Sequence, residues 1–235
     1  MQPFDFWIEG QNHSPYNDGV SCTVLDSNQQ IMSTAEIPEF VSVGDYLATE
    51  ETATTRSEYI DGWVRAMTGA TNRHNRVKGN CFYQFKRALN GKQCQPYDSD
   101  TKVRIRKVGR TRFYYPDLQV VCESNAPTEV FQDAPVLLVE VLSPSTRQFD
   151  LDEKLTAYLD IPSLECYIIL EQHTPIAVVM RRTEKGFLRE TYDGTKASIL
   201  LPFLGCTLSL RDIYEGVEFT ATCVQEPVPE YEVIE

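Results

Sequence analysis

Residues 135–147 read PVLLVEVLSPSTR, and the architecture of the chain follows from this segment. The apolar run 136–139, resumed at Val141 and Leu142, is typical of a buried strand. Glu140 interrupts the run, and a carboxylate removed from water is unfavourable unless it is paired or coordinated. The sequence therefore predicts that Glu140 faces a compensating charge.

The segments around this strand alternate between helical and strand periodicity. Apolar spacing predicts helices at 43–51, at 72–89 with Gly91 ending it, and from a start at Asp150 to Pro162. Strands are predicted at 101–106, 111–121, 135–142 and 166–170, with a closing hairpin at 175–182 and 186–192. This order predicts an α/β fold with a mixed central β-sheet flanked by helices.

The main domain is expected at residues 36–214. Residues 1–35 lack clear periodicity and are rich in Asn, Gln, Ser and Asp, which indicates an N-terminal extension. Met32 is a plausible alternative start, so we hypothesise that the residues before it are dispensable. Residues 215–235 carry no basic residue and are predicted to form an acidic C-terminal tail.

Composition excludes several classes of protein. No apolar run in the 235 residues approaches the roughly 18 that a membrane span needs, and the N-terminus lacks the pattern of a signal peptide. The seven cysteines are scattered, odd in number and without a CxxC pair. We therefore expect a cytoplasmic protein with reduced thiols and without a structural zinc site.

Charge is distributed unevenly along the chain. The net charge is −12, yet residues 73–112 contain twelve Lys and Arg against two acids, a local balance of +10 that leaves −22 elsewhere. Such segregation indicates one basic surface, as in a nucleic-acid footprint, on an otherwise acidic protein. The alternative is an ordinary solvated helix face and hairpin, and charge alone does not separate the two.

Two carboxylates are candidates for a metal site. Asp117 follows Pro116 at the head of one predicted strand, and Glu140 lies within the next, 23 positions later. If these strands are neighbours, the carboxylates meet at one end of the sheet. Two such groups repel unless a cation lies between them, and oxygen ligands favour Mg²⁺ or Mn²⁺ over zinc. The backbone carbonyl of Val141 is the expected third ligand.

Lys154 is the candidate amine. Helical spacing places it at the edge of the apolar stripe, four residues after Asp150, and helix side chains point toward the N-terminus, where Glu140 lies. A lysine there is suited to orient or deprotonate a water, or to stabilise negative charge on a pentacovalent phosphate. Arg147 lies near the same line of the helix and is expected to support it.

Each residue also has an ordinary structural interpretation. Asp117 alone is typical of a turn or of the start of a strand. Lys154 alone could be a surface lysine whose stem covers apolar surface while its ammonium extends to solvent. Glu140 alone could form a structural ion pair with Arg104 or Arg147. The three residues at these positions together favour metal chemistry.

From Pro116-Asp117 through EVLSPSTRQFDLDEKLTAYLDIPSLECYIIL, the sequence resembles the Uma-two type of predicted restriction endonucleases, a branch of the PD-(D/E)XK nuclease superfamily. The similarity extends back through SDTKVRIR, SEYIDGWVRAMTGATNRHNRV and GDYLATEE, and it covers roughly residues 40–212. It implies a restriction-endonuclease-like core and Mg²⁺-dependent cleavage of phosphodiester bonds in DNA.

The resemblance also assigns site residues. The metal-binding Asp and Glu of the family fall on Asp117 and Glu140, and Glu58 matches an acidic position that assists the metal. This sequence departs from the superfamily motif because Leu142 stands where the motif has lysine. In this branch the lysine is thought to have moved to the next helix, which here means Lys154.

Two functions remain open from sequence. The first is a metal-dependent endonuclease that contacts DNA through residues 73–112. Restriction-type folds often work as symmetric dimers so that both strands are cut, which leaves a homodimer open here, but no stripe in the sequence identifies an interface. The second is a module of the same fold that binds DNA or a protein partner without catalysis. A serine or cysteine hydrolase and a P-loop NTPase are disfavoured, because neither GxSxG nor a complete phosphate-binding loop occurs.

Overall fold

The computed structural model describes residues 40–219. The predicted N-terminal extension, the alternative start at Met32 and the tail from residue 220 lie outside the described residues. The domain boundaries at 36 and 214 therefore stay predictions. Within the described part of the chain, no helix is long and apolar enough to cross a membrane.

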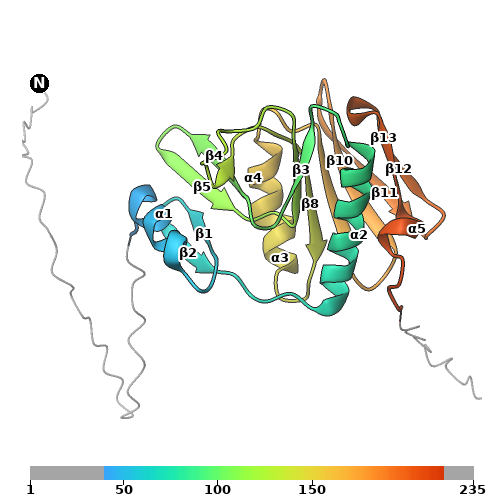
Figure 1. The fold of residues 1–235 in the computed structure, drawn as a ribbon, viewed down its shortest axis with the longest axis horizontal. Helices are drawn as coiled ribbons and strands as arrows, with labels where there is room; N and C mark the ends of the chain where they lie inside the picture. The colour runs from blue at the N-terminus through green and yellow to red at the C-terminus, as the bar shows by residue number, and fades with distance from the viewer. Residues whose placement is uncertain (1–39, 220–235) are drawn as a thin grey trace, which may run out of the picture. The chain divides into compact units, whose positions relative to one another are not determined.

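Figure 1 shows helices and strands that alternate along the described chain. The helices are α1 (Val43–Thr52), α2 (Asn72–Ala88), α3 (Arg147–Phe149), the π-helical turn η1 (Asp150–Lys154), α4 (Leu155–Leu159), the 3-10 turn η2 (Pro202–Leu204) and α5 (Leu210–Ile213). The first strands are β1 (Ser57–Ile60), β2 (Trp63–Ala66), β3 (Gln95–Asp98), β4 (Lys102–Lys107), β5 (Arg110–Tyr114), β6 (Leu118–Val121) and β7 (Phe131–Gln132). The later strands are β8 (Pro135–Leu142), β9 (Cys166–Glu171), β10 (Ile176–Thr183), β11 (Gly186–Asp193), β12 (Ser198–Leu201) and β13 (Cys206–Ser209).

A six-stranded sheet forms the centre of the fold. Its strand order is β11-β10-β9-β8-β6-β3, and β8 pairs parallel with β9 while the other neighbours pair antiparallel. The predicted buried strand at 135–142 coincides with β8. The predicted mixed α/β sheet is therefore confirmed, with the segment that carries Glu140 at its centre.

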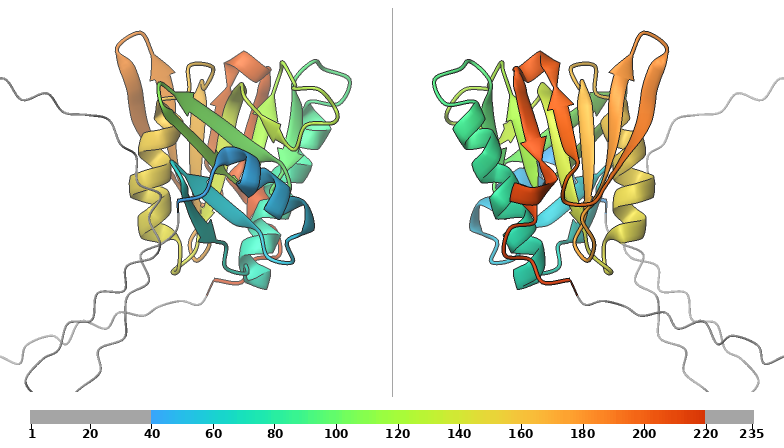
Figure 2. Two further views of the ribbon diagram at one scale, coloured as in Figure 1. Left: turned by 90° about the vertical axis from the view of Figure 1, so that its left-hand side faces the viewer. Right: turned by 90° about the vertical axis from the view of Figure 1, so that its right-hand side faces the viewer.

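The two faces of β8 belong to different layers, because side chains alternate along a strand. Leu137, Val139 and Val141 pack in the cluster that includes the apolar stripe of α2. Leu138 and Leu142 pack on the other side, in the cluster that includes residues of α4. Figure 2 shows α2 and α4 on opposite sides of the sheet. Glu140 has the parity of the second face, so it is directed toward η1 and α4.

A second, five-stranded sheet has the order β2-β1-β5-β4-β7. The sequence predicted one strand over 111–121, but the chain is in this sheet until Tyr114 and enters the central sheet at Leu118. Pro116 lies between the two strands, and proline has no N–H for a strand ladder. The prediction of a single strand is wrong, and the break places Asp117 where the two sheets meet.

The hairpin of β1 and β2 brings Glu58 into the fold. Its two-residue turn is Asp61-Gly62, with φ values of 51° and 104°. Positive φ at both positions is the requirement of a type I′ turn, which suits the twist of an antiparallel pair. Glu58, the second residue of β1, is only 3% exposed.

One disulfide contradicts the expectation of reduced thiols. Cys94 and Cys122 are bonded at the ends of β3 and β6. Gln95 pairs with Val121 in the antiparallel register of these strands, so the two cysteines face each other. The spacing of the cysteines carried no information on this pairing, because it depends on the register. Cys81, Cys166 and Cys206 are the free cysteines of the described chain.

Candidate active site

A pocket of about 510 Å³ lies where the start of β6 meets the end of β8, between α2 and η1. Its lining includes all three residues that the sequence nominated, Asp117, Glu140 and Lys154. It also includes His74 and Asp150. The structure therefore brings the nominated residues together; the role of each remains a prediction.

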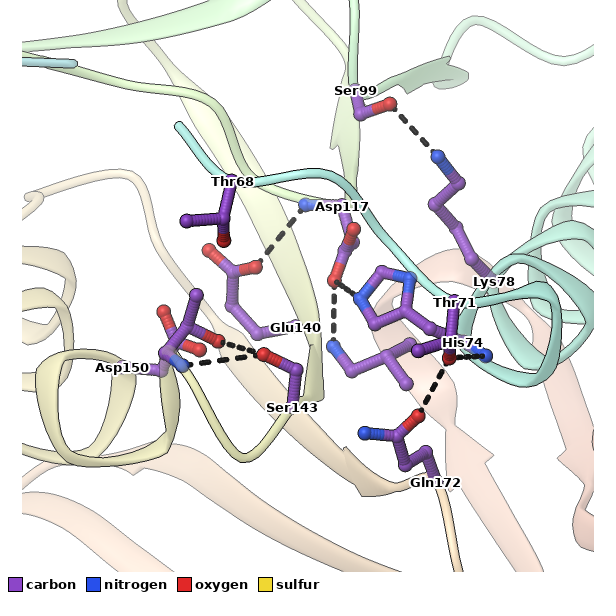
Figure 3. A network of polar contacts seen from close by, with 12 residues as sticks. Thr68, Thr71, His74, Lys78, Ser99, Asp117, Glu140, Ser143, Asp150 and Gln172 are labelled. Carbon is purple, nitrogen blue, oxygen red and sulfur yellow. Dashed lines mark hydrogen bonds and ion pairs between the residues drawn. The ribbon is translucent and has the colours of Figure 1, made fainter. Parts of the chain in front are cut away.

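Asp117 and Glu140 are neighbours across the β6–β8 pair. The antiparallel register places Leu118 opposite Val139, so the next residues face each other. The backbone N–H of Asp117 donates to Glu140 Oε2 at 3.3 Å, and the N–H of Val141 donates to Asp117 Oδ2 at 2.8 Å. Figure 3 shows Asp117 between Glu140 and His74.

His74 is a partner of Asp117 that the sequence did not reveal. Its Nε2 lies 3.0 Å from Asp117 Oδ2, and its side chain is 8% exposed. Burial by itself raises the pKa of Asp117, but the hydrogen bonds from His74 and Val141 N–H and the charge of Lys154 hold it below its ordinary value. Hydrogen bonds therefore hold the carboxylate of Asp117 in place from α2 and from β8.

Glu140 is 3% exposed, and the sequence predicted that it faces a compensating charge. Its Oε1 accepts hydrogen bonds from Lys154 Nζ at 3.0 Å and from the Tyr158 hydroxyl at 2.9 Å. The alternative ion pairs do not form, because Arg104 binds Asp133 and Arg147 binds Glu171.

Lys154 lies at the centre of three carboxylates. Its Nζ is 2.9 Å from Glu58 Oε1, 3.0 Å from Glu140 Oε1 and 3.5 Å from Asp150 Oδ1. Burial by itself lowers the pKa of Lys154, but the surrounding acids outweigh burial and raise it above its ordinary value. Lys154 is a buried ammonium, contrary to the alternative of a lysine that extends to solvent.

The buried acids outnumber the buried ammonium. Burial raises the pKa of Glu140 well above its ordinary value; Lys154 opposes this, while Asp150, Asp117 and Glu58 add to it. Asp150 Oδ1 is buried and has no hydrogen-bond partner among residues 40–219. Uncompensated carboxylates are unfavourable away from water, so the site favours additional positive charge.

The donor set suits a hard divalent cation. Asp117 and Glu140 offer carboxylate oxygens side by side, and Val141 lines the same pocket. No group of three or more His, Cys, Asp and Glu side chains in a metal-binding arrangement occurs within the described residues. A cation held here would therefore depend on two carboxylates and backbone or water oxygens, which is the ligand chemistry of Mg²⁺.

Sequence patterns misplaced two residues of this region. Asp150 was predicted to begin a helix, but the helix begins at Arg147, and Asp150 is 2% exposed in the wall of the pocket. Arg147 was expected to support Lys154, but its guanidinium binds Glu171 at 2.8 Å and its side chain is 51% exposed. The π-helical turn shifts these positions relative to the regular helix that the spacing assumed.

The chain is similar in sequence to other proteins. The model of the Uma2 family, described as "Putative restriction endonuclease", matches residues 43–211. An uncharacterized protein of Synechocystis sp. is 29% identical over 181 residues, which are 76% of this chain and 94% of that protein. A second uncharacterized protein of Synechocystis sp. is 32% identical over 137 residues, 57% of this chain and 76% of that protein.

A crystal structure from Anabaena variabilis, described as a "putative nuclease belonging to DUF820", has the same fold. The TM-score is 0.61 at 16% identity, over 74% of this chain and 98% of that chain. The central mixed sheet with helices on both faces is thus the α/β core of a restriction-endonuclease-like protein. Within that class, the chain belongs to the Uma2 family.

Proposed function

We propose that this protein is an endonuclease that hydrolyses phosphodiester bonds of DNA with Mg²⁺, for which Mn²⁺ can substitute. The observation that carries the proposal is the surplus of buried carboxylates around Lys154, at the point where Asp117 and Glu140 meet. Membership of the Uma2 family supports it, since the family description is that of a restriction endonuclease.

In this proposal Asp117, Glu140 and the carbonyl of Val141 hold the cation. Mg²⁺, when bound, polarises the scissile phosphate and lowers the pKa of a bound water. His74 and the N–H of Val141 fix the carboxylate of Asp117, and Tyr158 fixes that of Glu140. The site is therefore held in place from both faces of the sheet before substrate arrives.

Lys154 acts as an ammonium in this mechanism. Its raised pKa disfavours removal of a proton from water. Its Nζ is oriented by Glu58 and Asp150, so it can stabilise negative charge on the pentacovalent phosphate and position the attacking water by hydrogen bonding.

The test is nicking of supercoiled plasmid with Mg²⁺ or Mn²⁺. We expect cleavage by the wild type, loss in Glu140→Ala and Lys154→Ala, and full activity in the control Glu190→Ala, whose carboxylate binds Arg181 on the outer hairpin. Equal activity in all four proteins would show that the assigned residues are wrong.

A second measurement separates the enzyme from a non-catalytic module of the same fold. We expect Mn²⁺ to raise the melting temperature of the wild type but not of Glu140→Ala, because ligand binding stabilises the folded state. Cation binding and DNA binding without cleavage would favour the module. A wild type that neither binds the cation nor cuts DNA would contradict the proposed function.

A further inference from the structure

Gly79 occupies an exposed position in the middle of α2. A Cβ built at this position meets no heavy atom within 4 Å, so packing within residues 40–219 does not require glycine there. Glycine destabilises the interior of a helix relative to alanine, because it loses more backbone entropy on folding. Glycine is nevertheless suited to places where a ligand approaches the backbone closely.

The side chains around Gly79 are polar, basic or aromatic. At 100° per residue, Asn75, Tyr83 and Lys86 lie within about 40° of Gly79 on the same side of α2. All three are exposed, and Tyr83 is 63% exposed. The surface beside Gly79 therefore offers hydrogen-bond donors, one positive charge and one aromatic ring to solvent.

The positive charge of α2 is not balanced by nearby acids. Residues 71–97 contain no Asp or Glu. The cations of the helix are Arg73, Arg76, Lys78, Lys86 and Arg87. Within the described chain none of these five forms an ion pair, whereas most cations elsewhere in the basic segment do. This helix thus carries the largest group of cations in segment 73–112 without ion-pair partners; Lys92, Lys102 and Arg110 are the others in the described chain.

The same helix forms one wall of the pocket. His74, Asn75 and Lys78 line it from the first two turns of α2. Lys78 Nζ donates to Ser99 Oγ at 2.9 Å, and Arg56 Nη1 donates to the carbonyl of Ser99 at 3.2 Å (Figure 3 shows the lysine contact). The pocket therefore has a basic rim that continues outward along α2.

We propose that the α2 face (Asn75, Gly79, Tyr83 and Lys86), together with Lys78 at the rim of the pocket, binds the sugar–phosphate backbone of the nucleic acid strand whose scissile phosphate lies in the pocket. The proposal rests on the proposed function. Lys78 and Lys86 neutralise successive stretches of phosphate, and the absent side chain of Gly79 lets the strand lie against the helix. Charge complementarity and continuity with the pocket both favour a polyanion as the occupant.

The main experiment measures DNA binding and folding separately. Fluorescence anisotropy with a fluorescein-labelled DNA duplex is recorded in EDTA, so cleavage does not contribute. We expect Gly79→Leu to weaken binding roughly tenfold, with a smaller loss in Gly79→Ala. Both variants should melt at or above the wild-type temperature, because leucine and alanine are better helix formers and meet open space. Weaker binding by a more stable protein excludes unfolding as the cause.

A matched pair of charge reversals tests whether the bound DNA strand runs along α2 or across the β4–β5 hairpin. Lys86→Glu removes a free cation of the α2 face, and Lys107→Glu makes the same charge change where Lys107 binds Asp160 at 2.5 Å. We expect Lys86→Glu to weaken binding and to flatten the salt dependence by about one phosphate contact, roughly 0.9 in the log–log slope. Lys107→Glu should bind as the wild type does.

The inference is overturned if Gly79→Leu binds DNA as tightly as the wild type, or if Lys107→Glu loses as much affinity as Lys86→Glu. If the wild type nicks plasmid and either of these results is found, binding of the strand at the α2 face is excluded while the proposed endonuclease function is retained. Absence of DNA binding, with a dimer in sedimentation that Gly79→Leu dissociates, would assign the face to a second copy of the chain instead.

Discussion

Two sets of ion pairs in this protein have similar contact distances but different surroundings. Around Lys154, nitrogen–oxygen distances are 2.9 to 3.5 Å, and the lysine side chain is 6% exposed. On the β4–β5 hairpin, Lys107 lies 2.5 Å from Asp160, and its side chain is 55% exposed. Burial, and not distance, determines what each contact contributes, because water screens only the hairpin.

The two regions also differ in charge balance. The hairpin cations Arg104, Lys107 and Arg112 each have a carboxylate partner. The Lys154 cluster instead places three acids around one ammonium. A surplus of buried acids is unfavourable for folding unless it is compensated, and the cation site that we propose would compensate it. The hairpin pairs are ordinary structural contacts.

The largest expected effect is at Lys154. Lys154→Met leaves Glu58, Glu140 and Asp150 buried without their cation, and breaking a buried pair in this way costs about 3–5 kcal/mol of unfolding free energy. Urea unfolding in EDTA measures the loss. Adding Glu58→Gln to this variant should restore part of it, because one uncompensated acid is removed. A loss of unfolding free energy no larger than that of a surface lysine would contradict the difference between the buried cluster and the hairpin.

The second-largest loss of stability is expected on removal of the Tyr158 hydroxyl, which donates a hydrogen bond to Glu140. Tyr158→Phe removes the 2.9 Å hydrogen bond to Glu140 Oε1 in a fully buried setting, which we expect to cost about 1.5 kcal/mol. Tyr192→Phe is the matched control, since its hydroxyl donates to Glu190 Oε2 at 2.8 Å nearer the surface. Chemical denaturation should show a smaller loss in the control; equal losses would contradict the role of burial.

An intermediate effect is expected at Arg104, whose guanidinium makes two hydrogen bonds to Asp133 at 2.7 and 2.6 Å. Arg104→Met should cost about 1 kcal/mol. Burial by itself raises the pKa of Asp133, but the bonds from Arg104 and Asn125 hold it below its ordinary value. A lowered folded-state pKa stabilises the fold above the unfolded-state pKa, about 3.9, and this contribution is lost as pH falls through the folded-state value.

The stability difference between wild type and Arg104→Met should accordingly be constant near neutral pH and should shrink below about pH 4. Unfolding midpoints measured across this range test the sign. A difference that grows on acidification would mean that Asp133 is not the partner that matters.

The smallest effect is expected at Lys107. Lys107→Ala removes an exposed pair with Asp160, and such pairs contribute at most about 0.5 kcal/mol. Thermal unfolding should place the variant within error of the wild type at moderate salt. A large loss here would show that the hairpin pair is as consequential as the buried cluster.

Local patterns predicted the elements well where one period dominated. The buried strand at 135–142 coincides with β8, and the predicted helix at 72–89 is α2, with Gly91 just beyond its end at a φ of 74°. The sequence also predicted that Asp117 and Glu140 lie close together, because neighbouring strands bring residues at the same end of the sheet side by side.

Predictions failed where the structure depends on the register between strands or on the chain passing from one sheet to another. The strand predicted across Pro116 is two strands in two sheets. The Cys94–Cys122 bond depends on the pairing of β3 with β6. His74 gave a faint signal as a polar residue three positions before Val77 on the apolar stripe of α2, but helical spacing does not indicate what lies opposite a helix.

The sequence by itself determined the α/β class, the central strand and the family resemblance, and it nominated the two carboxylates and the lysine that the structure brings together. These follow from periodicity and residue chemistry, which are properties of short segments. Only the tertiary structure decided that Lys154 is buried among three acids, that His74 holds Asp117, and that the cations of α2 stay unpaired while most cations of the hairpin have a carboxylate partner. Burial and charge pairing arise from segments distant in sequence, so no local pattern encodes them.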